Sequence, residues 1–347
     1  MRSLKIIGIP LLLAITLFVG YILVSTGFFR TVEHQFDGKL LKKVAIKGAE
    51  DITISSSDSF ALISSTERRV YPPQEKEKGG VYLIDIASED FTPISLTSNF
   101  EQDFAPHGIS LFKKDSTYQV MVVNHTQQGH SIEVFELDGQ QMKHQRTLRH
   151  PALVHPNDLI QVDNNRFYFT NDHKYTEGIG RLVEEYSGLA ISNVMYFDGK
   201  DYREIANGIA YANGINYDRT RNLMYVASPR HFLVKVYDVE ADGSLSFIED
   251  IPCGTGVDNI ELDDAGHLWI GGHPNLLRFG AYSKAKKETA PSEIIKITYR
   301  AKGDYSVESI YTDDGTEMSG ASAAAVLGNL IFAGNVMDDE FLILESN

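Results

Sequence analysis

Short runs of alternating apolar and polar residues occupy most of the chain. Residues 81–86, 131–137 and 233–239 alternate in this way, and clusters of Gly, Asn and Asp bound them. A two-residue period is typical of β-strands, whose successive side chains point to opposite faces of a sheet. The Asp138-Gly139 pair predicts a hairpin turn between two such strands. The pattern therefore predicts an all-β chain.

One phrase recurs six times along this pattern: a polar start, a few alternating apolar residues, a polar turn and a second β-rich run. The six starts lie at Glu50-Asp51, His107, Asn157-Asp158, Asn213, Asp258-Asn259 and Ser319, which are 45 to 61 residues apart. Repeats of roughly 40–50 residues with several strands each are typical of β-propellers. We predict a six-bladed β-propeller over residues 31–347. The strand-like segment 38–47 is expected to complete the last blade near residues 341–344 and so remove free sheet edges.

The clearest helical pattern inside this region lies at residues 175–191. Leu182, Val183, Tyr186 and Leu189 are spaced to share one apolar face of a helix. A single helix within an all-β repeat can cover a propeller face or a pocket mouth, or it can patch the core. The sequence leaves these alternatives open.

The apolar pattern of the N-terminal residues 1–30 predicts a signal anchor. Arg2 and Lys5 precede an uncharged run from residue 6 to residue 29, which Arg30 ends. A helix of this length rises ~36 Å at ~1.5 Å per residue, enough to cross a ~30 Å hydrocarbon core. A cleaved signal has a shorter apolar stretch, so we favour a retained transmembrane anchor. The greater positive charge before the run places residues 31–347 outside the cytoplasm, in the periplasm or extracellular space. If the segment is cleaved, the protein is secreted.

Composition excludes several functions. The formal net charge of −15 argues against a nucleic-acid partner, which usually requires a basic surface. Cys253 is the single cysteine, so no intrachain disulfide can form. The sequence contains no Gly-x-Ser-x-Gly, no His-Glu-x-x-His and no phosphate-binding glycine loop. A hydrolytic reaction would therefore have to be assisted by a metal ion.

The six polar starts supply the ligands for such an ion, because the innermost strand of every propeller blade begins near the central axis. The starts carry carboxylates (Glu50, Asp51, Asp158 and Asp258) and amides (Asn157, Asn213 and Asn259). An oxygen-rich set without thiolates indicates a hard cation, and ligands from several blades suit Ca²⁺ better than the small octahedron of Mg²⁺.

Strand geometry predicts two calcium ions. Adjacent side chains on a strand point to opposite sides, so neighbours such as Glu50 and Asp51 should not reach the same ion. One ion would be held by Glu50, Asn157, Asn213, Asp258 and Asn259, and the other by Asp51, Asp158 and nearby backbone carbonyls. Joint ligation by Asp258 and Asn259 breaks the alternation and requires an irregular strand start.

Histidines and aromatic residues complete the expected site. His107 opens the second repeat and should lie beside the ion, and His125 follows the next strand. A neutral imidazole near a cation can take a proton from water near neutral pH, which predicts catalytic roles for both. Tyr211, His273 and Phe279 are expected to line the substrate pocket, and His155, two residues before Asn157, is a further candidate.

The chain resembles the serum paraoxonase/arylesterase family. The matching stretches are 49–54, 106–110, 122–125, 157–158, 170–173, 211–216, 257–260 and 268–275, in the same order from about residue 34 to residue 344. The resemblance implies a calcium-dependent propeller hydrolase with a catalytic ion on Glu50, Asn157, Asn213, Asp258 and Asn259. It also implies a structural ion on Asp51, Asp158 and the backbone carbonyl of Ile109, and a histidine dyad of His107 and His125. The chain departs from the family in three ways: the disulfide that joins the termini of animal members is impossible here, Gly272 replaces a common cysteine, and the 66–80 loop and the region 174–191, which border the pocket in the family, differ considerably.

We therefore expect a calcium-dependent hydrolase of carboxylic esters and lactones, an arylesterase or lactonase with organophosphates as possible side substrates. One alternative is a sugar-lactone hydrolase on a similar propeller, which predicts a more polar pocket and a single ion. The other is a non-catalytic, calcium-stabilised binding propeller. Bound-ion counts and turnover assays distinguish these three hypotheses.

Overall fold

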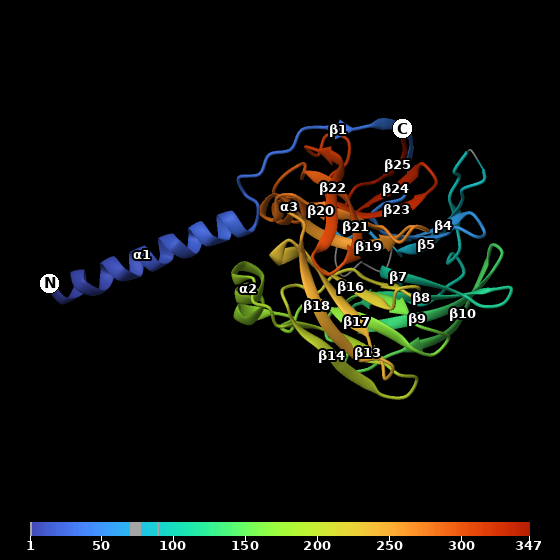
Figure 1. The fold of residues 1–347 in the computed structure, drawn as a ribbon, viewed down its shortest axis with the longest axis horizontal. Helices are drawn as coiled ribbons and strands as arrows, with labels where there is room; N and C mark the ends of the chain where they lie inside the picture. Colours follow the sequence, from blue (N-terminus) through green and yellow to red (C-terminus); the bar gives the residue numbers. More distant parts are fainter. Residues whose placement is uncertain (1, 70–77, 89) are drawn as a thin grey trace.

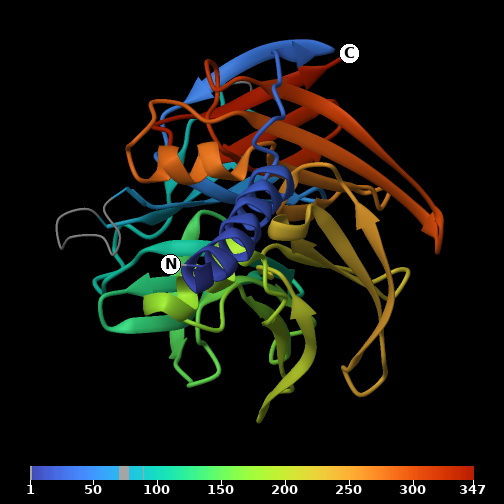
Figure 2. The same cartoon turned by 90° about the vertical axis from the view of Figure 1, so that its left-hand side faces the viewer.

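Six antiparallel sheets surround a central axis and form a β-propeller (Figures 1 and 2). The computed structural model describes residues 2–69, 78–88 and 90–347. The innermost strands β3, β7, β11, β15, β19 and β23 contact one another in that order, and β23 returns to β3. The all-β, six-bladed prediction is confirmed within the described residues.

The strands of the first three blades are consecutive in the sequence. The first blade consists of β3 (Ala49–Ser55), β4 (Phe60–Ser65), β5 (Gly80–Asp85) and β6 (Ile94–Ser95). The second consists of β7 (Pro106–Lys113), β8 (Tyr118–Thr126), β9 (Gly129–Asp138) and β10 (Gln141–Leu148). The third consists of β11 (Pro156–Gln161), β12 (Phe167–Asn171), β13 (Ser192–Phe197) and β14 (Tyr202–Ile209).

N-terminal strands join two of the remaining three blades. The fourth blade consists of β15 (Ile215–Asp218), β16 (Leu223–Ser228), β17 (Leu233–Val239) and β18 (Leu245–Pro252). The fifth consists of β19 (Gly256–Leu262), β20 (Leu268–His273), β21 (Ser292–Ala301), β22 (Asp304–Asp313) and the edge strand β1 (Gln35–Phe36). The sixth consists of β23 (Ala321–Leu327), β24 (Leu330–Asn335), β25 (Phe341–Ser346) and β2 (Gly38–Val44).

The predicted closure of the ring by the N-terminal segment is confirmed. Strand β2 pairs antiparallel with β25, with Gly38 opposite Ser346 and Leu40 opposite Leu344. A Lys39–Glu345 ion pair of 2.6 Å crosses the same junction. Hydrogen-bonded strands thus hold the ring closed in a chain that has no disulfide to join its termini.

The core consists of six apolar clusters, each lying between two neighbouring blades. Consecutive residues of one strand serve different clusters: Leu62 faces the second blade and Ile63 faces the sixth. Both faces of each sheet are therefore buried, which explains why strands such as β8 show long apolar runs with little exposed alternation.

The helices lie at one end of the propeller axis (Figures 1 and 2). They are α1 (Arg2–Ser25), α2 (Gly178–Ser187), the short 3₁₀ helix η1 (Pro229–His231) and α3 (Leu276–Ser283). Helix α2 confirms the helix predicted at 175–191 with shorter bounds. Its expected apolar face does not patch the core: Leu182 and Val183 are exposed, and the buried side chain is Glu184, which accepts from the backbone amides of Lys174 and Tyr175.

Helix α1 projects away from the propeller (Figure 1), and its C-terminal end contacts α2 and η1. The Tyr21 hydroxyl donates to the Ser187 carbonyl at 2.9 Å, Arg230 donates to the Ser25 carbonyl at 3.0 Å, and the Leu276 amide donates to the Thr26 carbonyl. Among the helices formed by the described residues, none combines the length and hydropathy that crossing a membrane requires. The transmembrane anchor therefore stays a prediction.

Candidate active site

The inner strands begin with β-bulges. Pairing slips between Ala49 and Asp51, between Pro106 and Ile109, between Pro156 and Leu159, and between Val257 and Ile260. A bulge re-aims side chains that a regular strand would send to opposite faces. The irregular start that joint action of Asp258 and Asn259 requires is therefore present, and four other blades repeat it, the sixth between Ala321 and Ala323.

At the polar starts of the repeats, four buried side chains from four blades carry an oxygen that accepts no hydrogen bond: Glu50, Asn157, Asn213 and Asn259. We call them the orphan-oxygen set. The amide nitrogens are all engaged: Asn157 donates to Asp172, Asn213 to Asp258, and Asn259 to the Glu50 carboxylate at 2.9 Å. Because each nitrogen faces a carboxylate, each amide oxygen points elsewhere and has no donor.

This set fits a hard cation. A buried polar atom without a partner costs about 1–3 kcal/mol, so four such oxygens at one hub are suited to binding a cation. Carboxylate and amide oxygens are the ligands that Ca²⁺ takes in proteins. The predicted ligand Asp258 differs from the set, because Asn213 and the His273 Nε2 atom, at 2.9 Å, already contact its two oxygens.

The two other predicted carboxylates, Asp51 and Asp158, are clasped by backbone amides of two blades each. Asp51 accepts from Ile52 at 2.9 Å and from Ile109 of the second blade at 2.8 Å. Asp158 accepts from Leu159 at 2.7 Å and from Ile215 of the fourth blade at 2.8 Å. We call Asp51 and Asp158 the clasp carboxylates. The structure places Ile109 beside Asp51 through its amide, and the ligand role of its carbonyl stays a prediction.

Glycine is needed where these blades meet. A Cβ atom on Gly108 would lie 2.5 Å from the Asp158 Oδ1 atom, and one on Gly214 would lie 2.4 Å from the Asp258 carbonyl. Real Cβ atoms do not approach that closely, so a side chain at either position would push two inner strands apart. The carboxylates can converge because the facing strands lack side chains at these points.

The charge balance at the hub differs between the two sets. Burial raises the pKa of Glu50, but His107, Arg68 and Asn259 outweigh it and lower that pKa to about 2. Burial and the nearby Glu50 charge raise the pKa of Asp51 well above its usual range. Burial and Asp51 do the same for the pKa of Asp158. The clasp carboxylates therefore lack a compensating positive charge among the protein's own groups.

The predicted catalytic histidines lie together beside Glu50. The Nε2 atom of His107 is 3.2 Å from the Glu50 Oε1 atom, and its Nδ1 atom is 3.0 Å from the Nε2 atom of His125. His125 is buried, and burial followed by the charges of neighbouring histidines lowers its pKa well below the usual value. His125 is therefore neutral near pH 7 and can hold the His107 ring in position.

A second cluster consists of His155, Asp172 and His173. His155 was a further candidate for the pocket, whereas Asp172 and His173 were not among the predicted site residues. The Nδ1 atoms of both histidines lie 2.6 Å from the same Asp172 oxygen, and the other Asp172 oxygen accepts from Asn157. One potential ligand atom from each of these three side chains lies within 4.8 Å of the other two, so the described residues form a cluster compact enough to be considered as a metal site. Two ligand atoms that each lie ~2.0–2.2 Å from one ion are farther than 2.6 Å from each other. The arrangement is therefore that of one carboxylate shared by two imidazoles.

Arg68 was also missed, because it lies outside the repeated phrase. It donates to the carbonyls of Gly48 at 2.9 Å and Pro106 at 2.7 Å, and its guanidinium is 3.8 Å from the Glu50 Oε2 atom. The 66–80 loop thus reaches the site through its described beginning. Residues 70–77 lie outside the described residues.

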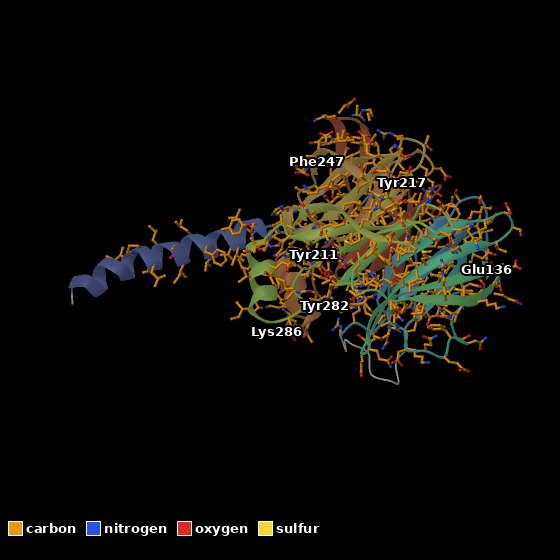
Figure 3. The ribbon with its side chains drawn as sticks, turned by 90° about the horizontal axis from the view of Figure 1, so that it is seen from below. Glu136, Tyr211, Tyr217, Phe247, Tyr282 and Lys286 are labelled. Atoms are coloured by element: carbon orange, nitrogen blue, oxygen red, sulfur yellow. The ribbon has the colours of Figure 1, made fainter. Side chains whose placement is uncertain are left out.

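The predicted pocket aromatics lie at the same end of the axis. Tyr211 has a left-handed backbone (φ 63°), and its ring meets that of His173 edge-on at 4.5 Å. A tyrosine in this conformation is strained, which is common at functional sites. His273 stacks on Phe279 of α3 at 3.8 Å. Figure 3 shows Tyr211 and Tyr282 toward the α1 end, and Tyr217 and Glu136 farther from it.

A cavity of about 200 Å³ lies on the other side of the clasp carboxylates. Thr53, Asp158, Asn216 and Glu261 are among its lining residues. Burial, followed by the charge of Asp51, raises the pKa of Glu261 well above its usual range. Neither the orphan oxygens nor the histidines of the candidate site line this cavity.

Known proteins resemble the chain in both sequence and fold. The arylesterase family model matches residues 29–342. Human serum paraoxonase/arylesterase 1 is 32% identical over 302 residues, which cover 83% of each chain, and the rat protein of that name is 34% identical over 299 residues with the same coverage. A luciferin-regenerating enzyme (TM-score 0.55, 13% identity, 90% of this chain and 95% of that chain) shares the fold. So does a calcium-binding regucalcin of Agrobacterium tumefaciens (TM-score 0.52, 12% identity, 91% and 95%). The family match spans all six blades and every residue of the site described above, and the chain therefore belongs to the arylesterase family.

Proposed function

We propose that this protein is a calcium-dependent hydrolase of carboxylic esters and lactones. Family membership and relatives named as arylesterases and lactonases support the reaction class. The observation that carries the proposal is the orphan-oxygen set beside the His107–His125 pair. Buried oxygens that lack donors, next to two hydrogen-bonded imidazoles, combine a cation site with a base.

The orphan-oxygen set and Asp258 would hold a catalytic ion, and the clasp carboxylates with the Ile109 carbonyl would hold a structural one. When bound, calcium supplies an electrophile that polarises a substrate carbonyl. The His107 Nε2 atom accepts a proton from the attacking water. His125, bonded to the other nitrogen of that ring, orients the imidazole and shares its charge. A positioned base of this kind contributes ~10²–10⁴-fold to the rate.

Tyr211, His273 and Phe279 would position the substrate. The stacked His273–Phe279 pair presents a flat surface, and the Tyr211 ring stands against His173. Because His273 is held by Asp258, the pocket wall and the ion site are joined directly. An aryl or alkyl group of the substrate, packed against these rings, would exclude bulk water from the substrate carbonyl next to His107.

A substrate panel with and without chelator tests this function. We expect turnover of an aryl ester and an aliphatic lactone that chelation abolishes and calcium restores. Turnover confined to sugar lactones, with one ion per chain, would support the sugar-lactone alternative. Calcium-dependent stability without turnover of any ester or lactone would support a binding propeller and contradict the proposal. Organophosphate hydrolysis, if measured, would be a side activity of the same site.

We also propose that α1 anchors an exported propeller to a membrane. The basic residues before the apolar run support this orientation, as do exposed side chains such as Ile9, Leu12 and Phe18 on the projecting helix. Fractionation of cells that express the full chain tests it. Recovery with membranes, released by deletion of residues 1–25, supports an anchor. Recovery of the uncleaved chain in the cytoplasm contradicts both parts of the proposal.

A further inference from the structure

A third imidazole lies beyond the His107–His125 pair, on the hairpin that joins β8 to β9. The Nδ1 atom of His130 is 2.8 Å from the Nδ1 atom of His125, and the two rings meet edge-on with centroids 4.7 Å apart. His130 is half-buried, whereas His125 is fully buried. His130 therefore extends the pair from the hub toward solvent.

The β-hairpin fixes this contact. His125 and His130 are directly opposite each other in the β8–β9 ladder, so their side chains share one face of the sheet. The turn between them is closed by the Thr126 hydroxyl, which donates to the Gly129 carbonyl, and Gly129 has a positive φ of 110°. The spacing of the two histidines thus follows from backbone pairing and does not depend on flexible side chains.

The protonation states suit transfer of a proton along the chain. Burial first, and then the neighbouring His155, lower the pKa of His130 to about 4, and the pKa of His125 is lowered too. The groups that face His130 are His125 and His155, with Asp172 and His107 farther away. Both rings are neutral near pH 7, and a neutral imidazole donates from one nitrogen and accepts at the other.

We propose that His130 is a relay residue that exchanges protons between the His107–His125 pair and solvent. The inference rests on the proposed hydrolysis. When water attacks, its O–H bond breaks and His107 gains a proton at Nε2. His107 then passes its Nδ1 proton to Nε2 of His125, His125 passes its Nδ1 proton to Nδ1 of His130, and the Nε2 proton of His130 leaves to solvent.

The reverse sequence protonates the leaving alkoxide. Solvent protonates His130 at Nε2, the protons move back along the same two hydrogen bonds, and His107 gives its Nε2 proton to the alcohol. The three rings then have their starting protonation, and the net proton released is that of the carboxylic acid product. His130 touches neither substrate nor ion in this scheme and acts only through His125.

The test compares His130→Gln with His150→Gln, which removes a histidine that stacks on Tyr202 outside the chain of three. In weak buffer we expect kcat of His130→Gln to fall by about 10-fold, less than the ~10²–10⁴-fold contributed by the base itself. Free imidazole should restore most of the loss, and KM should change little. The wild type and His150→Gln should show neither the loss nor the rescue. A His130→Gln enzyme with unchanged kcat in weak buffer, or with a loss that imidazole does not restore, would overturn the relay.

Two further results keep this test independent of folding and of the function. If His130→Gln does not fold, ¹⁵N spectra of the wild-type protein decide: a coupling through the hydrogen bond between the two Nδ1 nuclei is expected, and its absence contradicts the relay. A wild type that hydrolyses no ester or lactone contradicts the proposed function itself. If the wild type turns over normally and His130→Gln has the same kcat in weak buffer, the result contradicts the relay but not the proposed function.

Discussion

Glu50 and Asp51 are neighbours in the sequence, yet their carboxylates lie in different surroundings. Both oxygens of Asp51 accept backbone amides, one of them from another blade. Glu50 leaves one buried oxygen without a donor and directs the other toward His107 and Asn259. One bulged strand start thus carries two kinds of carboxylate: Asp51 joins blades through backbone amides, and Glu50 keeps an oxygen that is available to the proposed ion.

The largest expected effect separates these neighbours directly. Asp51→Ala leaves the amides of Ile52 and Ile109 buried without an acceptor, at about 1–3 kcal/mol each, and removes a link between the first two blades. We expect a loss of several kcal/mol from a total stability of ~5–15 kcal/mol, measured by urea unfolding. Asp201→Ala, at an exposed position, is the control. Equal unfolding midpoints for the two variants would contradict the clasp.

The second prediction concerns the base. His107→Gln should lower kcat by ~10²–10⁴-fold, because the proton acceptor is lost. The unfolding midpoint should stay close to that of the wild type, since His107 makes none of the clasp hydrogen bonds. Steady-state kinetics and thermal unfolding on the same samples check both parts, with His150→Gln as the matched control. Full activity in His107→Gln would remove this residue from the mechanism.

The third prediction tests the orphan-oxygen set. Glu50→Gln keeps the size of the side chain and removes its charge, so calcium affinity and kcat/KM should fall by at least about 100-fold. Excess chelator should bring the unfolding midpoints of Glu50→Gln and the wild type close together, because the set contributes to stability through the ion. If Glu50→Gln unfolds as readily as Asp51→Ala in chelator, the orphan-oxygen set and the clasp carboxylates do not differ in their contribution to stability.

The smallest effect is a pH dependence of stability. The lowered pKa values of His125 and His130 mean that the unfolded chain binds more protons than the folded one below pH ~6.5, so stability should fall as the pH falls. For His130 the loss develops between pH ~6.5 and its folded pKa of about 4. Urea midpoints in chelator should therefore decline less steeply in His130→Gln than in the wild type. Parallel declines would show that His130 does not titrate in this way.

The blades could be predicted from the sequence because strand alternation and the repeated polar start are local signals. The ligand hypothesis required an irregular strand at Asp258-Asn259, but the local sequence could not explain it, because the bulge depends on pairing with β20. The sequence could not predict which side of α2 is buried for a similar reason. The inward position of Glu184 is fixed by the backbone amides of residues 174 and 175. Local patterns therefore define the elements, and tertiary pairing decides which side chains they present.

The site divides in the same way. The four orphan oxygens lie at repeated starts, so their convergence follows from the propeller itself. Asp172, Arg68 and His130 lie outside those starts: Asp172 directly follows β12, Arg68 lies in a loop and His130 lies in a hairpin. Asp172 lies in the family-matching stretch 170–173, and His130 had a local signal: a histidine five residues after His125 across a short turn predicts a cross-strand pair.

The central claim is that distant acid and amide oxygens at the hub bind calcium. Its most direct test is the calcium content of chelator-treated, reloaded and dialysed protein, measured for the wild type and for Glu50→Gln. The account predicts two ions per chain in the wild type and only the structural ion in Glu50→Gln. A wild-type protein that retains no calcium, or a Glu50→Gln protein that retains both ions with unchanged affinity, would contradict it.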